Sequence, residues 1–443
     1  MGLPRVAIVG SGVSGLAAAH ALKGKAQITL FEAADYFGGH AHTVDVSLNA
    51  PNGEPITSGV DTGFLVFNER TYPGLIQLFQ DLGVDSAASD MSFSVQAKGF
   101  WSGVDLEWCG SNLQGLFAQK SNLLRPRFWY LIKEILRFNR LATEFANQLV
   151  QGHETPENTW SLGQYLKHHG FGRDFQAGYL LPMLGCIWSC PTEQMLAHSA
   201  ASLVRFCHNH GLLQVTRRPK WFTPRGGSKN YVNKIVSGVS DARLNEPVLS
   251  IDRSADGVLL VTTRHSERFD AAIVATHAHQ ALSMLKDPLE HEREILGAIR
   301  VQSNEAVLHT DTRVMPTRKI AWAAWNFETG NASSQDSKVC LHYWLNCLQP
   351  LPFEQDVFVT LNPIEPIAQE HVLGRFNYDH PVLDQVATQA QSRLKELNSG
   401  QTPVWFAGAW MGYGFHEDGF QAGLRAAHAL EQSLQAMKGS SSA

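Results

Sequence analysis

The 443-residue chain lacks an excess of positive charge, which argues against a nucleic-acid-binding protein. Its 36 Lys and Arg are outnumbered by 41 Asp and Glu, giving a formal net charge of −5, whereas nucleic-acid-binding domains usually carry a basic face. The chain also lacks a run of about 18 apolar residues that would predict a membrane span. Because 44% of residues are hydrophobic and only 17% are charged, we expect a folded protein with a large core rather than a disordered chain.

Cysteine is scarce as well, and no C-x-x-C pair occurs among the six Cys residues. Six in a chain of this length are too few for a disulfide framework, so we expect free thiols and a cytoplasmic protein. The N-terminus lacks the basic start and apolar segment of a signal peptide, because residues 6–9 run directly into glycines.

The N-terminal segment contains a complete dinucleotide-binding fingerprint. A predicted strand, 5–9, precedes Gly10-Ser11-Gly12-Val13-Ser14-Gly15, and a predicted helix and a second strand, 27–31, lead to Glu32. The first Gly of this motif permits a tight turn, the second brings the backbone to a pyrophosphate, and the third packs the helix on the strand. The acid accepts hydrogen bonds from ribose hydroxyls and disfavours a 2′-phosphate, so NADP is not expected here.

Further motifs resemble the flavin-containing amine oxidase and phytoene desaturase superfamily. Gly38-Gly39-His40-Ala41-His42-Thr43 follows the acid, and Asp61-Thr62-Gly63-Phe64 comes later. The chain most resembles bacterial FAD-binding proteins that are associated with cyclopropane-fatty-acid-synthase-like lipid methyltransferases. The stretches that carry this resemblance are 61–73, 89–94, 184–189, 321–326 and 343–346. The resemblance covers nearly the whole chain and implies FAD, which we expect to be bound non-covalently because no Cys lies in an obvious attachment motif.

The resemblance also implies where FAD is contacted. Val248 would lie at the adenine through its backbone, and Ala275 near the pyrophosphate. A strand ending at Gly408 would lead to a helix from Gly419, whose N-terminus would point at the flavin edge where negative charge gathers on reduction. The expected cofactor-binding residues are Gly10, Ser11, Gly12, Val13, Ser14, Gly15, Glu32, Ala33, Gly38, Gly39, His40, Thr43, Gly63, Phe64, Val248, Ala275, Gly408, Gly419 and Phe420.

These elements predict an α/β fold in which two domains are interwoven. The FAD-binding domain would be Rossmann-like, a doubly wound parallel sheet with a β-hairpin insertion, and the substrate domain α+β. We place the FAD-binding domain at 1–75, 220–285 and 400–437, and the substrate domain at 76–219 and 286–399. Residues 438–443 would form a frayed tail.

Three departures from the amine oxidase pattern bear on the chemistry. His40 stands where the superfamily has Arg, and the predicted strand 301–309 lacks the Lys that many amine oxidases place near the flavin. His416 occupies the position of a cavity-lining Tyr and is our candidate catalytic residue, because His can transfer a proton near neutral pH. A purely structural role, as a donor to a backbone carbonyl, is the alternative. Trp410 and Tyr413 are in the same loop and are expected to line the cavity.

Two His-Ala-His triplets, 40–42 and 277–279, resemble half of a metal site. No Cys or carboxylate cluster accompanies them in ligand spacing, so we expect no metal.

The segment 124–141 is basic, aromatic and amphipathic, and a helix is expected to begin near Pro126. Such a helix suits an anionic membrane surface, and a helix that merely covers the substrate domain is the alternative. A second basic and aromatic cluster is at 217–221. The apolar face of the predicted helix is Phe128, Leu131, Ile132, Ile135, Phe138 and Leu141.

Our leading prediction is an FAD-dependent oxidoreductase of desaturase or oxidase type that removes a hydride to flavin N5 from a hydrophobic substrate, by desaturation of a lipid acyl chain. One alternative is an oxygen-dependent flavin amine oxidase. The other is a non-catalytic flavoprotein partner of a lipid methyltransferase. The expected partners are therefore a lipid or other hydrophobic molecule, a membrane surface and such a methyltransferase, with no nucleic acid.

Overall fold

The computed structural model of the chain describes residues 2–214, 218–254, 257–329 and 339–440. Its first body is built on a five-stranded sheet of order β10-β2-β1-β14-β20 in which all neighbours are parallel. The strands are β1 (Arg5–Val9), β2 (Gln27–Phe31), β10 (Asp241–Arg243), β14 (Ala271–Val274) and β20 (Val404–Phe406). The strands predicted at 5–9 and 27–31 are therefore confirmed with the same bounds.

Both faces of this sheet are covered, so its strands are apolar on both sides. Val6 and Ile8 of β1 belong to one core, and Ala7 and Val9 to the other, as the alternation of a strand requires. The first face is covered by α1 (Val13–Leu22), α2 (Pro73–Leu82), α10 (Lys229–Val236) and α16 (His416–Ser440). The second is covered by the antiparallel strands β11 (Val248–Ser254), β12 (Gly257–Thr262) and β13 (Ser266–Phe269), and by α11 (Ala278–Met284), α12 (Glu290–Ala298), α14 (Gln385–Gln391) and α15 (Leu394–Leu397).

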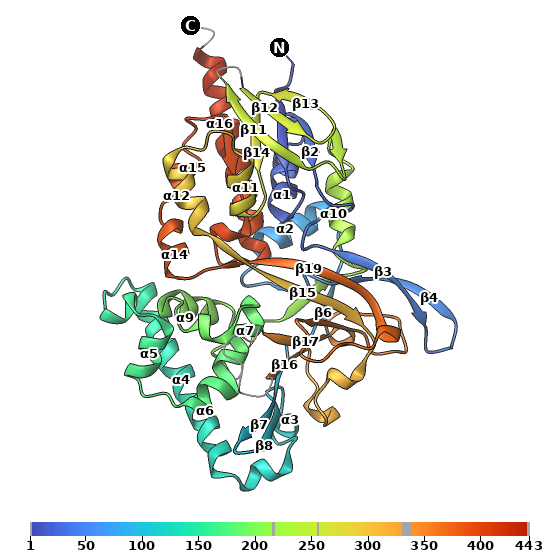
Figure 1. Cartoon of the computed structure of the whole chain (residues 1–443), viewed down its shortest axis with the longest axis vertical. Helices are drawn as coiled ribbons and strands as arrows, with labels where there is room; N and C mark the ends of the chain where they lie inside the picture. Colours follow the sequence, from blue (N-terminus) through green and yellow to red (C-terminus); the bar gives the residue numbers. More distant parts are fainter. Residues whose placement is uncertain (1, 215–217, 255–256, 330–338, 441–443) are drawn as a thin grey trace.

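The second body is a seven-stranded sheet of order β19-β15-β18-β17-β16-β7-β8 with helices packed against it. Its strands are β7 (Phe93–Trp101), β8 (Val104–Cys109), β15 (Arg300–His309), β16 (Trp325–Thr329), β17 (Cys340–Trp344), β18 (Phe358–Leu361) and β19 (Val372–Val382). The helices outside the first body are α3 (Leu113–Leu116), α4 (Pro126–Val150), α5 (Leu162–His168), α6 (Arg173–Phe175), α7 (Leu181–Trp188), α8 (Thr192–Met195), α9 (Ala200–Asn209) and α13 (Leu345–Leu348). Figure 1 shows this body at the end of the molecule opposite the two chain termini.

Two small sheets join the bodies: β3 (Thr43–Asn49) pairs with β4 (Pro55–Asp61), and β9 (Trp221–Pro224) lies between β5 (Phe67–Asn68) and β6 (Ser86–Ser89). The predicted α/β class with a parallel Rossmann-like sheet is confirmed. The exact domain boundaries stay a prediction, and residues 441–443 of the predicted tail lie outside the described residues. Among the described residues, no helix combines the length and apolarity that crossing a bilayer needs.

The final helix begins earlier than the sequence predicts, at His416 instead of Gly419. The carboxylate of Asp418 accepts a hydrogen bond from the backbone N–H of Phe415 at 3.0 Å. This is the reach-back half of a capping box, which satisfies a free donor at a helix start. The glycine pattern therefore marks the packing of the helix and not its first residue.

Candidate active site

A cavity of about 610 Å³ is lined by residues of both bodies. It runs from the glycine motif at the start of α1 to aromatic side chains of the second body. The predicted residues that line it are Gly10, Gly12, Val13, Ser14, Glu32, Ala33, Gly39, His40, Gly63, Phe64, Val248, Ala275, Gly408 and His416. Trp410 and Tyr413 line it too, as expected.

Six predicted cofactor residues lie behind the cavity wall: Ser11, Gly15, Gly38, Thr43, Gly419 and Phe420. Ser11 positions Glu32, Phe420 is part of the core under the parallel sheet, and the hydroxyl of Thr43 bonds to the carboxylate of Asp61. A Cβ on Gly419 would lie 2.7 Å from Cγ1 of Val13, so this glycine lets α16 approach α1. Their geometry is that of positioning residues.

The glycine motif shapes one end of the cavity for a phosphate group. A Cβ on Gly15 would lie 1.9 Å from the carbonyl oxygen of Gly10, so helix and strand pack closely only with glycine there. A Cβ on Gly12 would meet no protein atom within 4 Å. Gly12 is the N-cap of α1 and has no side-chain cap, so the first N–H groups of the helix are presented to the cavity as an anion site.

Glu32 is held at the end of β2 with room for one further partner. Its Oε2 accepts from the backbone N–H of Ser11 at 2.9 Å and from its hydroxyl at 2.6 Å, and its Oε1 accepts from the N–H of Ala34 at 3.0 Å. A carboxylate accepts about four hydrogen bonds. A ribose hydroxyl therefore fits the remaining site on Oε1.

His40 carries an unpartnered nitrogen in the wall. Its Nε2 is buried and has no hydrogen-bond partner among the described groups, and leaving a buried polar atom unpaired costs about 1–3 kcal/mol. Burial, aided by neighbouring His380 and His277, lowers the pKa of His40 well below 6.5, so the ring is neutral. FAD offers hydroxyl groups that can donate to such an atom, and the glycine motif, Glu32 and His40 together fit FAD.

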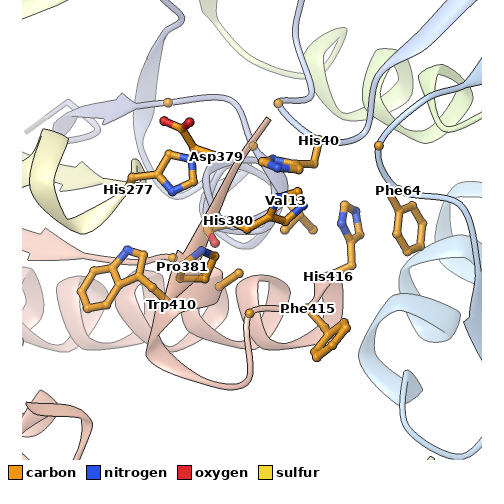
Figure 2. Close-up of a pocket in the computed structure, with 18 of the residues that line it drawn as sticks. Val13, His40, Phe64, His277, Asp379, His380, Pro381, Trp410, Phe415 and His416 are labelled. Carbon is orange, nitrogen blue, oxygen red and sulfur yellow. The ribbon is translucent and has the colours of Figure 1, made fainter. Parts of the chain in front are cut away.

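Figure 2 shows His416 beside Phe64, and the two rings stack with centroids 3.8 Å apart. Nε2 of His416 lies 2.6 Å from the hydroxyl of Tyr231. Burial lowers the pKa of His416 to about 3. The ring therefore stays neutral at physiological pH, where the sequence alone suggested a group that titrates near 7. A buried Tyr hydroxyl needs an acceptor, and Nε2 is the one in reach, so the proton of His416 resides on Nδ1.

His380 of β19 also lines the cavity, and a chain of hydrogen bonds fixes its tautomer. The N–H of Glu305 donates to Oδ1 of Asn362 at 3.1 Å, so the other atom of that amide is Nδ2, which donates to Oδ1 of Asn304 at 2.8 Å. Nδ2 of Asn304 then lies 3.0 Å from Nδ1 of His380. Burial lowers the pKa of His380 to about 4. Nδ1 of the neutral ring therefore accepts, and Nε2–H is left as a donor.

Asn304→Asp is expected to reverse that tautomer. A carboxylate can only accept, so Nδ1 of His380 must carry the proton, and Nε2 either loses its proton or the ring becomes charged. Nitrogen-15 NMR of labelled histidine distinguishes the two tautomers, with His380→Asn used to assign the signals. The internal control is His309, whose Nδ1 accepts from the N–H of Asp311 at 3.1 Å and should not change. A Nδ1–H signal for His380 in the parent protein would contradict the assignment.

Beyond His416 the cavity becomes an aromatic chamber. The ring of Phe206 lies 4.6 Å from that of Trp188 and 4.7 Å from that of Phe415. The apolar and aromatic residues of the chamber are Leu65, Val66, Met91, Ile187, Trp188, Phe206, Leu212, Trp221, Trp325, Tyr343, Tyr413 and Phe415. The carboxylates of the described lining are Glu32, Glu246 and Asp379, none of which belongs to the chamber.

His210 faces the same chamber and has the opposite tautomer to His380. Its Nδ1 lies 3.0 Å from the carbonyl oxygen of Phe206, which can only accept, so Nδ1 carries the proton. Burial lowers the pKa of His210 to about 4, so the ring is neutral and its Nε2 holds a lone pair. His210 is thus a proton acceptor in an apolar setting.

Sequence reasoning considered His277 only as a metal ligand, and it missed His210, Tyr231, Asp379 and His380. Each lies in a stretch without a recognisable motif, and each reaches the site through pairing or packing with distant residues. His380, for example, pairs with Gln302 across β15 and β19. The one available signal was the run of polar residues in the apolar strand context of 376–382.

The two His-Ala-His triplets do not come together as a ligand set. His40 and His277 line the cavity, whereas His42 stacks on Tyr36 with ring centroids 3.8 Å apart. In the part of the chain that is described, the group close enough to hold a metal ion is Glu328, Cys340 and His342, which is outside the cavity lining.

The sequence and the fold have counterparts among known proteins. A family model described as flavin containing amine oxidoreductase matches residues 13–349. Cyclohexylamine oxidase from Brevibacterium oxydans IH-35A superposes with a TM-score of 0.70 at 16% identity, covering 98% of this chain and 100% of that one. A putative protoporphyrinogen oxidase from Exiguobacterium sp. 255-15 gives 0.68 at 16% identity, with 98% and 99% covered.

A fatty acid isomerase from P. acnes that produces CLA gives a TM-score of 0.63 at 14% identity, covering 95% of this chain and 97% of that one. At these identities the structures show a shared fold. No curated protein sequence matches significantly.

Proposed function

The chain belongs to the flavin-containing amine oxidoreductase family, and on this premise we propose that it oxidises a hydrophobic substrate, a lipid acyl chain, by forming a C=C bond. As a member of that family it is an FAD-dependent oxidoreductase. The substrate and the reaction are our proposal.

The aromatic chamber carries the proposal. Its described lining offers no carboxylate to an ammonium group, and buried charges need such a partner. An acyl chain instead gains from burial against Trp188, Phe206 and Phe415, at about 25 cal/mol per Å² of apolar surface. The fatty acid isomerase among the structural neighbours supports this fold as a host for acyl chains.

In this proposal, residues of the chain accept a proton, donate a hydrogen bond and exclude water. Bound FAD would supply the acceptor for the hydride that one carbon of the substrate loses. The neighbouring carbon must lose a proton as the double bond forms. His210 lines the chamber and its Nδ1–H bonds to the carbonyl oxygen of Phe206, so its Nε2 is our candidate acceptor for that proton. His416 lines the cavity and keeps Nδ1–H as a donor, and the aromatic rings exclude water.

Anaerobic mixing with the FAD-loaded protein tests this function. We expect the absorbance of oxidised flavin near 450 nm to bleach with dispersed phospholipids or fatty acids, and mass spectrometry to find a product lighter by two hydrogens. The matched control is an alkyl amine of equal chain length. Bleaching by the amine alone, with peroxide released on aeration, would contradict the proposal.

That outcome would favour the second candidate, an amine oxidase, for which the cyclohexylamine oxidase neighbour is the specific observation. The absence of a Lys from β15 weighs against it. Bleaching by neither class would favour the non-catalytic partner of a lipid methyltransferase.

A further inference from the structure

The molecule exposes apolar side chains at one end, around η1 (Lys120–Leu124) and the start of α4. Leu124 is 89% exposed and Leu113 74%, while Leu123, Trp129 and Tyr130 are about half exposed. We call these five residues the apolar tip. Figure 1 shows α3 and the adjoining start of α4 at the end opposite the chain termini. Exposed Leu and Trp gathered in one place mark interaction surfaces in soluble proteins.

Contacts hold the apolar tip together as one surface. The indole N–H of Trp129 donates to the carbonyl oxygen of Leu123 at 2.9 Å, and its ring lies 5.4 Å from that of Phe117. The N–H of Phe117 in turn donates to the carbonyl oxygen of Leu113 at 3.2 Å. These contacts tie the Trp129 side chain to the backbone that carries Leu113 and Leu123.

This surface differs from the helix face that the sequence analysis considered for a membrane. Phe128, Leu131 and Phe138 are buried in the core of the second body. Their face packs against the substrate domain, as the alternative expected, and contact of this basic segment with a membrane stays a prediction. Of the second cluster, Arg217 lies outside the described residues.

The residues around the apolar tip carry positive charge, which favours a negatively charged partner. Residues 113–140 contain six basic residues and one acid, in a chain whose net charge is −5. The acid, Glu134, is buried and paired with Arg137 at 2.9 Å. Arg140 pairs with Glu144 at 3.5 Å, and the other four cations are Lys120, Arg125, Arg127 and Lys133.

We propose that the apolar tip and its cations dock the protein on an anionic lipid bilayer. Leu123, Leu124 and Trp129 would enter the interface between headgroups and acyl chains, while Arg127 and Lys133 contact lipid phosphates. Trp suits that depth because its ring is apolar and its N–H is polar. Docking does not depend on the proposed reaction, so either can fail without the other.

Co-sedimentation of the FAD-loaded protein with vesicles tests the surface. We expect binding to phosphatidylglycerol–phosphatidylcholine vesicles, at least tenfold weaker binding to pure phosphatidylcholine, and weaker binding in 1 M salt. Leu123→Ser with Leu124→Ser should lower the partition coefficient at least tenfold. So should Arg127→Glu with Lys133→Glu.

The matched controls change similar residues elsewhere. Leu249→Ser with Val386→Ser removes apolar side chains that are 54% and 58% exposed, and Lys395→Glu reverses a charge on α15; neither should alter binding. Retention of the flavin spectrum shows that each variant is folded. A parent protein that ignores every vesicle overturns the proposal, and so do apolar-tip variants that bind as the parent does.

Discussion

Gly12→Ala is expected to weaken the binding of FAD to the apoprotein by at least about 100-fold, or roughly 3 kcal/mol. The new methyl group would meet no protein atom within 4 Å, so the fold accepts it. It would instead occupy the space in which a pyrophosphate approaches the first N–H groups of α1. Fluorescence titration of the apoprotein with FAD measures the loss.

Gly172→Ala is the matched control. Gly172 is the N-cap of α6 with φ −76° and ψ 166°, close to the −60° and 175° of Gly12 at α1, and a Cβ there also meets no atom within 4 Å. Any effect of alanine on an N-cap is therefore common to both variants. If Gly12→Ala bound FAD as tightly as the parent does, the pyrophosphate could not lie at this end of the cavity.

The nucleotide end could be predicted because its constraints are local. The turn at Gly10, the close packing at Gly15 and the acid at Glu32 all arise within 30 residues of chain, and the structure has the strands at the predicted bounds. Such constraints leave a readable spacing in the sequence.

The chemistry of the other end could not be predicted, because it depends on pairings between distant residues. The tautomer of His380 is set by Asn304 and Asn362, which meet only when β15, β18 and β19 form one sheet. His416 was found by its position before the last helix, but its low pKa comes from burial and its orientation from Tyr231. A sequence motif can identify such a residue, but the charge of the residue depends on its burial in the fold.

These histidines share one electrostatic feature. Burial lowers the pKa of His210, His380 and His416 to about 4, 4 and 3, so all three are neutral at pH 7. A neutral imidazole has one donor and one acceptor, and the surrounding hydrogen bonds decide which atom faces the cavity. These three residues therefore present oriented dipoles to the site and no positive charge.

His416→Phe is expected to slow flavin reduction by substrate about 100-fold, because it removes one oriented donor from a site shielded from water. The ring stacked on Phe64 is preserved in shape, so FAD affinity should change little. Stopped-flow absorbance gives the rate and titration gives the affinity. An unchanged rate of flavin reduction would show that His416 serves only in packing.

The same variant removes the acceptor of the Tyr231 hydroxyl, which should cost about 1–3 kcal/mol of stability. Adding Tyr231→Phe should restore the stability without restoring the rate, and this separates the two roles.

The direction in which the stability of the folded protein changes with pH follows from the pKa of His416. The pKa of His416 is about 3 in the folded protein and about 6.5 in the unfolded chain. Between these values only the unfolded chain takes up the proton. As pH falls from 6.5 toward 3, the parent should therefore lose stability relative to His416→Phe by up to about 1.4 kcal/mol per pH unit. Because His416 is neutral throughout, it should add no acid limb to the rate profile between about pH 5 and 9.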